Sequence, residues 1–282
     1  LLAAGLSSVL SYVTSLVVLD VLHLSWRWIF RLPVILMLVG GVVVWLVARD
    51  RPGKLGFADF QDETGTDGTR TVDDLTHQET SWQRYKAALG NGKLMLAGLA
   101  IGFQSSVRYG LLIWVPVYFL GADFKHNPAG KWISIALPVG MALGAVTTGW
   151  ISDRFCKSRR SGVIATFMTL AAATTAGMYL LPQGHWLGLP VLFLSGFFAY
   201  GPQAAFWALA PDLLGRARAG TAVGVINCFA YAMAGLGEPL IGWLVQHNPW
   251  AAVPGVENPA LVFPVVTVFA LCSAGLALFI RR

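Results

Sequence analysis

The feature that most constrains this chain is a series of apolar runs, each about 20 residues long, the length a helix needs to cross the ~30 Å hydrocarbon core of a bilayer. The runs are continuous and do not alternate with polar residues, which is typical of membrane spans. Hydrophobic residues make up 56% of the chain and charged residues 12%, and that charged share is about half of what a soluble domain carries. The sequence therefore predicts an all-α membrane protein.

The apolar runs are unevenly spread along the chain. We expect eight spans, at residues 1–19, 30–48, 94–120, 132–151, 163–181, 187–209, 221–245 and 259–280. Residues 49–93 form a polar linker without apolar periodicity, and we expect a short helix near residues 81–89 within it. The first residue is a leucine inside an apolar run. We therefore interpret the sequence as a fragment whose N-terminal part is missing.

Basic residues predict the orientation of the spans. When successive loops are assigned to alternate sides, fifteen of the 20 lysines and arginines fall on the side of the linker and the C-terminus, and four fall on the other side. Loops rich in Lys and Arg stay in the cytoplasm. The linker and the C-terminus are thus expected to be cytoplasmic, and the net charge of +6 is explained by topology without a nucleic-acid partner.

One charge, Arg108, lies in the middle of an expected span. Placing an arginine at mid-bilayer costs about 3 kcal/mol on insertion scales, so Arg108 must face an aqueous cavity or a partner. Gln104 lies one helical turn earlier on the same face. The planar guanidinium suits phosphate or carboxylate oxygens. Two interpretations remain open: an anion-binding arginine, or an internal ion pair with a buried acid.

A buried acid is available in the seventh expected span, which carries a stripe of small and polar residues. The stripe is expected to face the bundle interior. Its members are spaced at helical intervals: Gly220, Gly224, Asn227, Tyr231, Gly235 and Glu238. Glu238 is open to three interpretations: a partner of Arg108, a protonatable site, or a carboxylate solvated near the outer interface.

The sixth expected span offers a second polar face. Tyr200, Gln203 and Trp207 follow one another at helical spacing, and Pro202 is expected to bend the helix. Hydroxyl and amide groups suit hydroxyls or phosphate oxygens of a ligand. The sequence shows no metal-ligand spacing and no activated nucleophile. We therefore expect no enzymatic activity, no metal and no cofactor.

The loop GWISDRFCKSRR, residues 149–160, resembles the cytoplasmic signature of the major facilitator superfamily between its eighth and ninth helices. The matching residues are Gly149, Asp153, Arg154, Arg159 and Arg160. The resemblance implies that these residues act as a conformational latch. In physical terms, Asp153 can bond helix-end amides, while the basic residues grip neighbouring helix ends and anionic lipid headgroups.

Three further stretches are similar to one branch of that superfamily, the organophosphate:phosphate antiporters. They are RYGLLIWVPVYF from Arg108, SWRWIFRLP with the following span and RDRPGKLGF, and the segment from YGPQAAFW to AMAGLGEP. The resemblance runs over nearly the whole chain and places it at the fifth to twelfth helices. Residues 1–48 would then end the N-terminal half-bundle, residues 49–93 would be the linker, and residues 94–282 would form the C-terminal six-helix half-bundle.

The resemblance implies a secondary transporter that exchanges an organophosphate for inorganic phosphate by alternating access. In that family two arginines hold the phosphate, and Arg108 matches the one on the seventh helix. The other, on the first helix, would lie outside this chain. Four polar residues are expected to meet the organic part of the substrate: Tyr200, Gln203, Asn227 and Tyr231. We expect a monomer in a bacterial inner membrane.

Three alternatives to an organophosphate exchanger stay open on the sequence alone. One is a membrane sensor of a phosphorylated sugar. Another is a carrier of a different anion or of a proton-coupled substrate, with Glu238 as the proton site. The third is a truncated copy without activity.

Overall fold

The computed structural model describes residues 2–48, 79–120, 128–154, 160–182, 185–215, 218–249 and 257–280. The regular structure in these ranges is entirely helical, which confirms the predicted fold class. The chain divides into two compact units, Leu10–Gln78 and a larger one made of Leu1–Val9 and Glu79–Arg282. Residues 49–78 of the predicted linker lie outside the described residues, and residues 79–93 are described.

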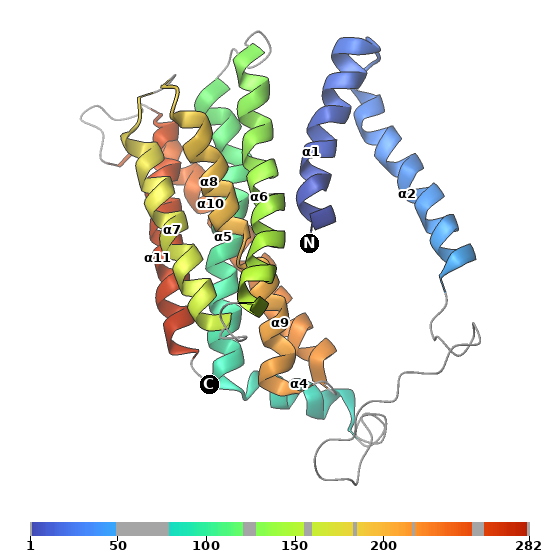
Figure 1. The fold of residues 1–282 in the computed structure, drawn as a ribbon, viewed down its shortest axis with the longest axis vertical. Helices are drawn as coiled ribbons and strands as arrows, with labels where there is room; N and C mark the ends of the chain where they lie inside the picture. The colour runs from blue at the N-terminus through green and yellow to red at the C-terminus, as the bar shows by residue number, and fades with distance from the viewer. Residues whose placement is uncertain are drawn as a thin grey trace. The chain divides into compact units, whose positions relative to one another are not determined.

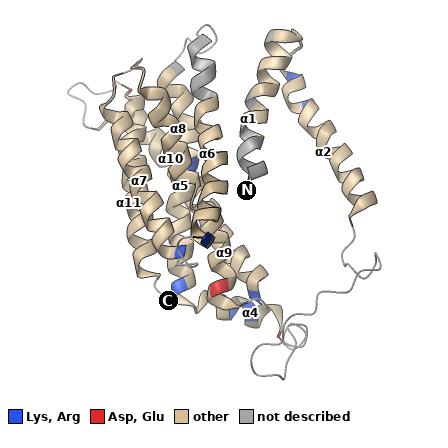
Figure 2. Ribbon diagram, viewed as in Figure 1, with Lys and Arg blue, Asp and Glu red and all other residues tan. Residues whose placement is uncertain are grey.

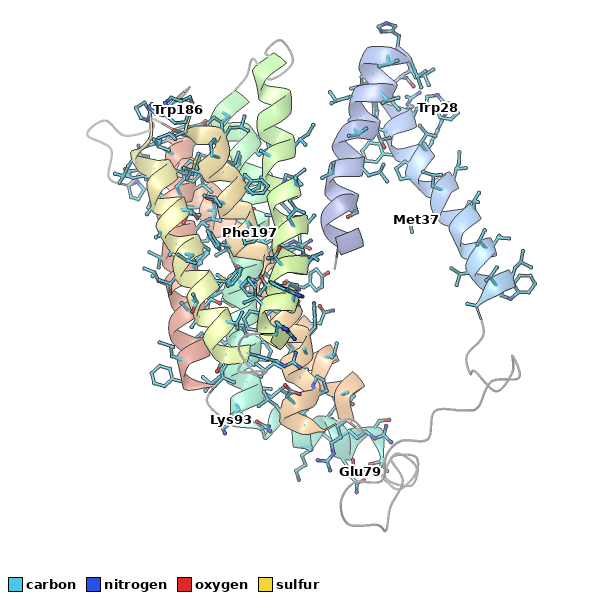
Figure 3. All side chains as sticks on the ribbon, in the orientation of Figure 1. Trp28, Met37, Glu79, Lys93, Trp186 and Phe197 are labelled. Atoms are coloured by element: carbon cyan, nitrogen blue, oxygen red, sulfur yellow. The ribbon has the colours of Figure 1, made fainter. Side chains whose placement is uncertain are left out.

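The N-terminal helices are apolar, and the second of them has aromatic side chains near its start. They are α1 (Leu2–Leu16), a π-helical turn (Val17–Val21) and α2 (Arg27–Val47). None of the side chains of α2 is buried, and Figure 3 shows Met37 projecting away from this helix. Near the start of α2, Cζ of Arg31 lies 5.5 Å from the centre of the Trp28 ring. Tryptophan and arginine together are typical of the interfacial end of a span.

The larger unit holds the remaining helices, most of which run alongside one another (Figure 1). They are α4 (Ser81–Leu89), α5 (Gly92–Leu120), α6 (Pro128–Arg154), α7 (Arg160–Leu180), α8 (Gly188–Tyr200), α9 (Gln203–Leu214), α10 (Ala219–His247), a 3-10 turn (Pro259–Leu261) and α11 (Val262–Phe279). Among the described residues, seven helical segments are long and apolar enough to cross a membrane, with α8 and α9 counted as one. The span expected at residues 1–19 contains a shorter apolar helix, Val9–Leu19.

The sixth expected span is built from two helices. α8 ends at Tyr200 and α9 begins at Gln203, so Gly201 and Pro202 lie between them. Proline removes a backbone donor from the helix, and the interruption falls where the sequence predicted a bend. A Cβ on Gly201 would lie 2.5 Å from Oγ1 of Thr148. Only glycine therefore lets this junction lie against α6.

Backbone-to-backbone packing joins α6 to α8. A Cβ on Gly140 would lie 2.1 Å from the carbonyl oxygen of Phe193, and one on Gly144 would lie 2.1 Å from that of Phe197. From the other side, a Cβ on Gly196 would lie 2.3 Å from the carbonyl oxygen of Leu137. Small residues four apart let membrane helices approach closely, and here they set the distance between the two helices.

Three hydroxyl hydrogen bonds fasten the helices around α5 and α11. Ser106 donates to the carbonyl oxygen of Met233 at 2.9 Å and so links α5 to α10. Ser273 donates to the carbonyl oxygen of Ala100 at 2.7 Å, which links α11 to α5. The Oγ1 atoms of Thr175 and Thr267 lie 2.8 Å apart between α7 and α11. In an apolar surrounding, such bonds fix helix rotation as well as helix distance.

Charged residues of the larger unit gather at one end. Figure 2 shows lysines and arginines concentrated where α4 and the end of α9 lie, and Figure 3 places Glu79 and Lys93 at that end and Trp186 at the other. This is the end that the distribution of basic loops predicts to be cytoplasmic.

Candidate anion-binding site

Arg108 lies deep within α5. At 1.5 Å per residue it is about 24 Å from the start of α5 at Gly92 and about 18 Å from its end at Leu120. Its side chain is half-buried. In the part of the chain that the structure describes, no carboxylate lies within ion-pairing distance of this guanidinium, and the ion pairs found there involve other arginines.

Two aromatic rings hold the Arg108 guanidinium. Its Cζ lies 4.7 Å from the ring centre of Tyr109 and 4.6 Å from that of Tyr200. A cation over a ring face is attracted by about 0.5–2 kcal/mol, depending on desolvation. Tyr200, at the end of α8, is only 2% exposed. An aromatic ring attracts the guanidinium without neutralising its charge, so the cation stays available for an oxyanion.

A third tyrosine extends this cluster towards α10. The ring centres of Tyr109 and Tyr231 lie 6.4 Å apart, and Tyr231 is 58% exposed. The sequence predicts Tyr200 and Tyr231 as site residues, but not Tyr109. Neighbouring residues do not share a helix face, so spacing alone gave no signal for Tyr109 beside Arg108.

The small and polar stripe of α10 lies on an exposed face of the larger unit. Gly220, Gly224 and Gly235 have no atom within 4 Å of the position that a Cβ would take, and Asn227 is half-buried. The stripe was expected to face the bundle interior. Within this unit the interior is instead packed by the apolar side of α10, which includes Ile226 and Ile241 among other residues. The stripe from Gly220 to Gly235 therefore forms an open surface, and its member Tyr231 meets the Arg108 cluster through Tyr109.

Two buried amides flank the tyrosine cluster. Gln104, one turn before Arg108, donates from Nε2 to the carbonyl oxygen of Ala199 at 2.8 Å and so ties α5 to α8. Its Oε1 is buried and has no partner among the described residues, and the same holds for Oε1 of Gln203 at the start of α9. A buried acceptor without a donor costs about 1–3 kcal/mol. Both oxygens are therefore suited to accept hydrogen bonds from hydroxyl groups.

Glu238 is bound to a different face of α5. Its Oε2 accepts a hydrogen bond from Nε1 of Trp114 at 3.1 Å, and a Cβ on Gly110 would lie 3.9 Å from its Oε1. Gly110 is about 200° around the helix from Arg108, at 100° per residue. In this structure Glu238 is thus hydrogen-bonded to Trp114, and it does not form an ion pair with Arg108.

The predicted latch residues lie at the charged end. Nε of Arg160, at the start of α7, donates to Oδ2 of Asp212 in α9 at 2.7 Å. Arg154 is exposed at the end of α6, and a Cβ on Gly149 would meet that of Ala204 at 3.7 Å. The side chain of Asp153 and all of Arg159 lie outside the described residues. Arg160 thus forms an ion pair with a side chain of α9, and the role of these residues as a latch stays a prediction.

Metal-binding clusters of His, Cys, Asp and Glu are absent from the described residues. Among its described residues, the larger unit thus offers one cation deep in a span, three tyrosines from α5, α8 and α10, and amide oxygens from α5 and α9. Chemically, this arrangement can bind an anion that carries hydroxyl groups.

The known proteins to which the chain is similar are named as transporters of phosphorylated compounds. At 27% identity, the chain is similar to the glycerol-3-phosphate transporter of Bacillus subtilis, over 81% of the chain and 52% of that protein. A putative glycerol-3-phosphate transporter of Arabidopsis thaliana is 28% identical, over 88% of the chain and 55% of its own length. The hexose-6-phosphate:phosphate antiporter of Escherichia coli K12 is 24% identical, over 86% and 53%.

The names of these relatives agree with the predicted resemblance to organophosphate carriers, and they are names of transporters, not of enzymes. The chain spans about half the length of the curated relatives it matches. The Major Facilitator Superfamily profile matches residues 1–238. On this match, and with its apolar helices, the chain is an integral membrane protein that belongs to the Major Facilitator Superfamily.

Proposed function

We propose that this chain is part of a secondary transporter that exchanges an organophosphate, a sugar phosphate or glycerol phosphate, for inorganic phosphate. The proposal rests on the surroundings of Arg108. This half-buried arginine lies deep in a span, contacts two tyrosine rings, and has no carboxylate at ion-pairing distance among the described residues. Such a guanidinium binds phosphate through a planar pair of N–H donors. The names of the relatives point to the same substrate class.

The organic part of the substrate has a place beside the phosphate. Gln203 presents an unpartnered amide oxygen, and Tyr200, Asn227 and Tyr231 carry groups that donate and accept hydrogen bonds. Tyr231 and Asn227 belong to the open stripe of α10, which gives a ligand access to the cluster. These four residues are proposed to bind the hydroxyl-bearing part while Arg108 binds the phosphoryl group.

Exchange follows from the cost of burying an unpaired charge. A carrier that closes around Arg108 without an anion leaves a guanidinium in a low-dielectric core, which carries a desolvation penalty. With an anion bound, the penalty is offset. Reorientation is therefore favoured in the loaded state, and the two half-bundles of such a carrier alternate around a central site. We place the carrier in a bacterial inner membrane, with the charged end in the cytoplasm.

The proposal is tested by exchange in proteoliposomes. The protein that contains this chain in its full length is reconstituted and loaded with radiolabelled phosphate, and external glycerol-3-phosphate or glucose-6-phosphate is added. We expect efflux that depends on the external substrate and that is abolished by Arg108→Lys, because lysine keeps the charge but loses the paired donors. Arg31→Lys, a matched change at the start of α2, should leave exchange intact.

Near-normal exchange by Arg108→Lys would refute the role of Arg108. Binding of glycerol-3-phosphate without any phosphate efflux would show a sensor instead of a carrier.

A proton-coupled carrier is a second candidate, favoured by Glu238. This carboxylate is half-buried, and one of its oxygens has no partner among the described residues. If Glu238 carries the coupling proton, transport should depend steeply on pH and lose that dependence in Glu238→Gln. A pH profile unchanged by Glu238→Gln excludes this candidate and leaves the exchanger.

A further inference from the structure

The short helix α4 has a defined start and a defined end. The Thr80 hydroxyl accepts from the backbone N–H of Gln83, and the Gln83 side chain accepts from the backbone N–H of Thr80, which together form a capping box. After Leu89 the chain turns, and Oδ1 of Asn91 accepts from the backbone N–H of Leu94 at the start of α5. Figure 1 shows α4 lying across the end of α5. α4 is therefore a separate element placed where α5 enters the bundle.

One face of α4 is packed and another is apolar but uncovered. Ala88 is fully buried. By contrast, Trp82 is 75% exposed, Tyr85 47% and Leu89 56%. These three residues are spaced three and four apart, so they lie on one face of the helix. A large aromatic, a tyrosine and a leucine are thus exposed together on a nine-residue helix.

An ion pair anchors the chain just before α4. Arg218, at the start of α10, binds Glu79 through two guanidinium nitrogens, one of them Nε at 2.9 Å from Oε2. Nη2 of Arg84 also donates to the Glu79 carbonyl oxygen at 3.2 Å. The hydrogen bond from Arg218 holds the pKa of the Glu79 carboxyl below its usual value. α4 is thus anchored to α10 at its N-terminal end and to α5 at its C-terminal end.

Two exposed lysines lie on α4 and just after it in the chain. Lys86 follows Trp82 by one turn, and Lys93 lies in the first turn of α5; both are exposed. Neither forms an ion pair within the described ranges. Lysines beside exposed aromatic residues are the pattern of a helix lying on a membrane surface, and each basic residue near an anionic leaflet contributes about 1 kcal/mol.

We propose that α4 lies in the headgroup layer of the bilayer and binds anionic phospholipid. Trp82, Tyr85 and Leu89 insert at the boundary with the acyl chains, and Lys86 and Lys93 bind headgroup phosphates. A lipid surface is favoured over a protein partner because α4 turns directly into a span. Four residues separate Leu89 from Leu94, so the apolar face of α4 is held at the level where the bilayer begins. This inference depends on the membrane location of the chain and not on the proposed exchange.

The test measures the depth of α4 in nanodiscs. All native cysteines of the full-length protein are replaced by serine, and a nitroxide is attached at Leu89→Cys or, as the matched control, at Gln83→Cys on the polar side of α4. Collision rates with oxygen and with a water-soluble nickel chelate are compared. We expect an oxygen-to-nickel ratio several-fold higher at residue 89 than at residue 83. Adding phosphatidylglycerol to phosphatidylcholine discs should raise the ratio at residue 89 further.

The double variant Lys86→Gln with Lys93→Gln distinguishes the effect of lipid charge on the depth of α4 from the effect of inserting its apolar side chains. It should keep the higher ratio at residue 89 but lose the response to phosphatidylglycerol. Equal ratios at residues 89 and 83 would place α4 in water and overturn the proposal. A label at residue 89 that is shielded from both oxygen and nickel would show a protein on this face, which overturns it as well.

Discussion

At the scale of single residues, the arrangement around Arg108 explains how a charge is kept in a span. The rings of Tyr109 and Tyr200 bind the guanidinium, whereas a carboxylate partner would neutralise it. The nearest acid of α10, Glu238, is bound by Trp114. Arg108 is thus stabilised without losing its attraction for an anion.

Tyr200 is predicted to act through its ring. Tyr200→Leu removes the face that holds the guanidinium, a loss of about 1–2 kcal/mol for a desolvated pair. If that energy goes into positioning Arg108, the KM for phosphate should rise about 5- to 30-fold. Tyr200→Phe keeps the ring and should bind inorganic phosphate with nearly unchanged KM. Steady-state exchange in proteoliposomes measures both, and equal KM values for the leucine and phenylalanine variants would contradict a role for the ring.

Sequence reasoning found Arg108 because an isolated charge in an apolar run is visible in the sequence itself. The partners of that charge were not visible. Tyr109 is its direct neighbour, and the contact between Trp114 and Glu238 joins residues far apart in the chain. Such contacts depend on the rotation of each helix about its axis, which a pattern of apolar runs does not specify.

At the scale of elements, helix lengths were predictable and helix contacts were not. The bilayer sets the length of a span, so the expected bounds of the span at residues 94–120 lie within a few residues of those of α5. The short helix α4 was expected at residues 81–89 and is found there, since the Thr80–Gln83 capping box defines its start. The close approach of α6 and α8 depends on Gly140, Gly144 and Gly196, and the sequence does not show which glycines meet a neighbouring backbone.

Gly144 is predicted to be intolerant of any side chain. A Cβ there would lie 2.1 Å from the carbonyl oxygen of Phe197, so Gly144→Val must force α6 and α8 apart. We expect loss of folded protein, or a melting temperature lower by several degrees, in detergent. Gly162→Ala is the control, because nothing lies within 4 Å of a Cβ at Gly162; it should be neutral or stabilising by up to about 1 kcal/mol. Similar melting temperatures for the two variants would contradict this packing.

The anchor of α4 is predicted to depend on pH. The pKa of the Glu79 carboxyl is lowered in the folded protein by its hydrogen bond to Arg218. A lowered pKa stabilises the fold above the unfolded value, about 4.3, and that stabilisation is lost as pH falls through the folded value. Amide-exchange protection of residues 81–89, corrected for intrinsic rates, should therefore be constant near neutral pH and decline below pH ~4.

Glu79→Gln provides the matched control for that titration. It should show reduced protection of residues 81–89 already at neutral pH and little further change in acid. Protection that declines in parallel in the wild type and in Glu79→Gln would assign the acid sensitivity to another group.

At the scale of the whole molecule, alternating access requires each half-bundle to move as a rigid body. In the larger unit, α7 and α9 are joined at the charged end by Arg160 and Asp212. The α5–α10 and α5–α11 contacts are fastened further inside by serine hydroxyls. In the proposed carrier, these links would let the unit transmit a displacement from the site to its charged end.

The pair Arg160 and Asp212 is predicted to be needed as a pair. Arg160→Asp places two carboxylates together and should lower both the melting temperature and the exchange rate. The double variant Arg160→Asp with Asp212→Arg restores opposite charges and should recover a substantial part of each. Thermal unfolding and exchange assays on the three proteins check this. Additive losses in the double variant would show that the two side chains act independently.

The tyrosine rings around Arg108 have a consequence for how such a carrier responds to acidity. A ring quadrupole neither gains nor loses a proton near neutrality, and a guanidinium stays charged throughout. With the proposed organophosphate as cargo, the group that titrates in this part of the site is the ligand itself, since the dianion of a phosphate monoester takes up a proton at pH ~6. Preference between the monoanion and the dianion would then be set by the ligand's own ionisation, and a mildly acidic medium would change which form the protein encounters.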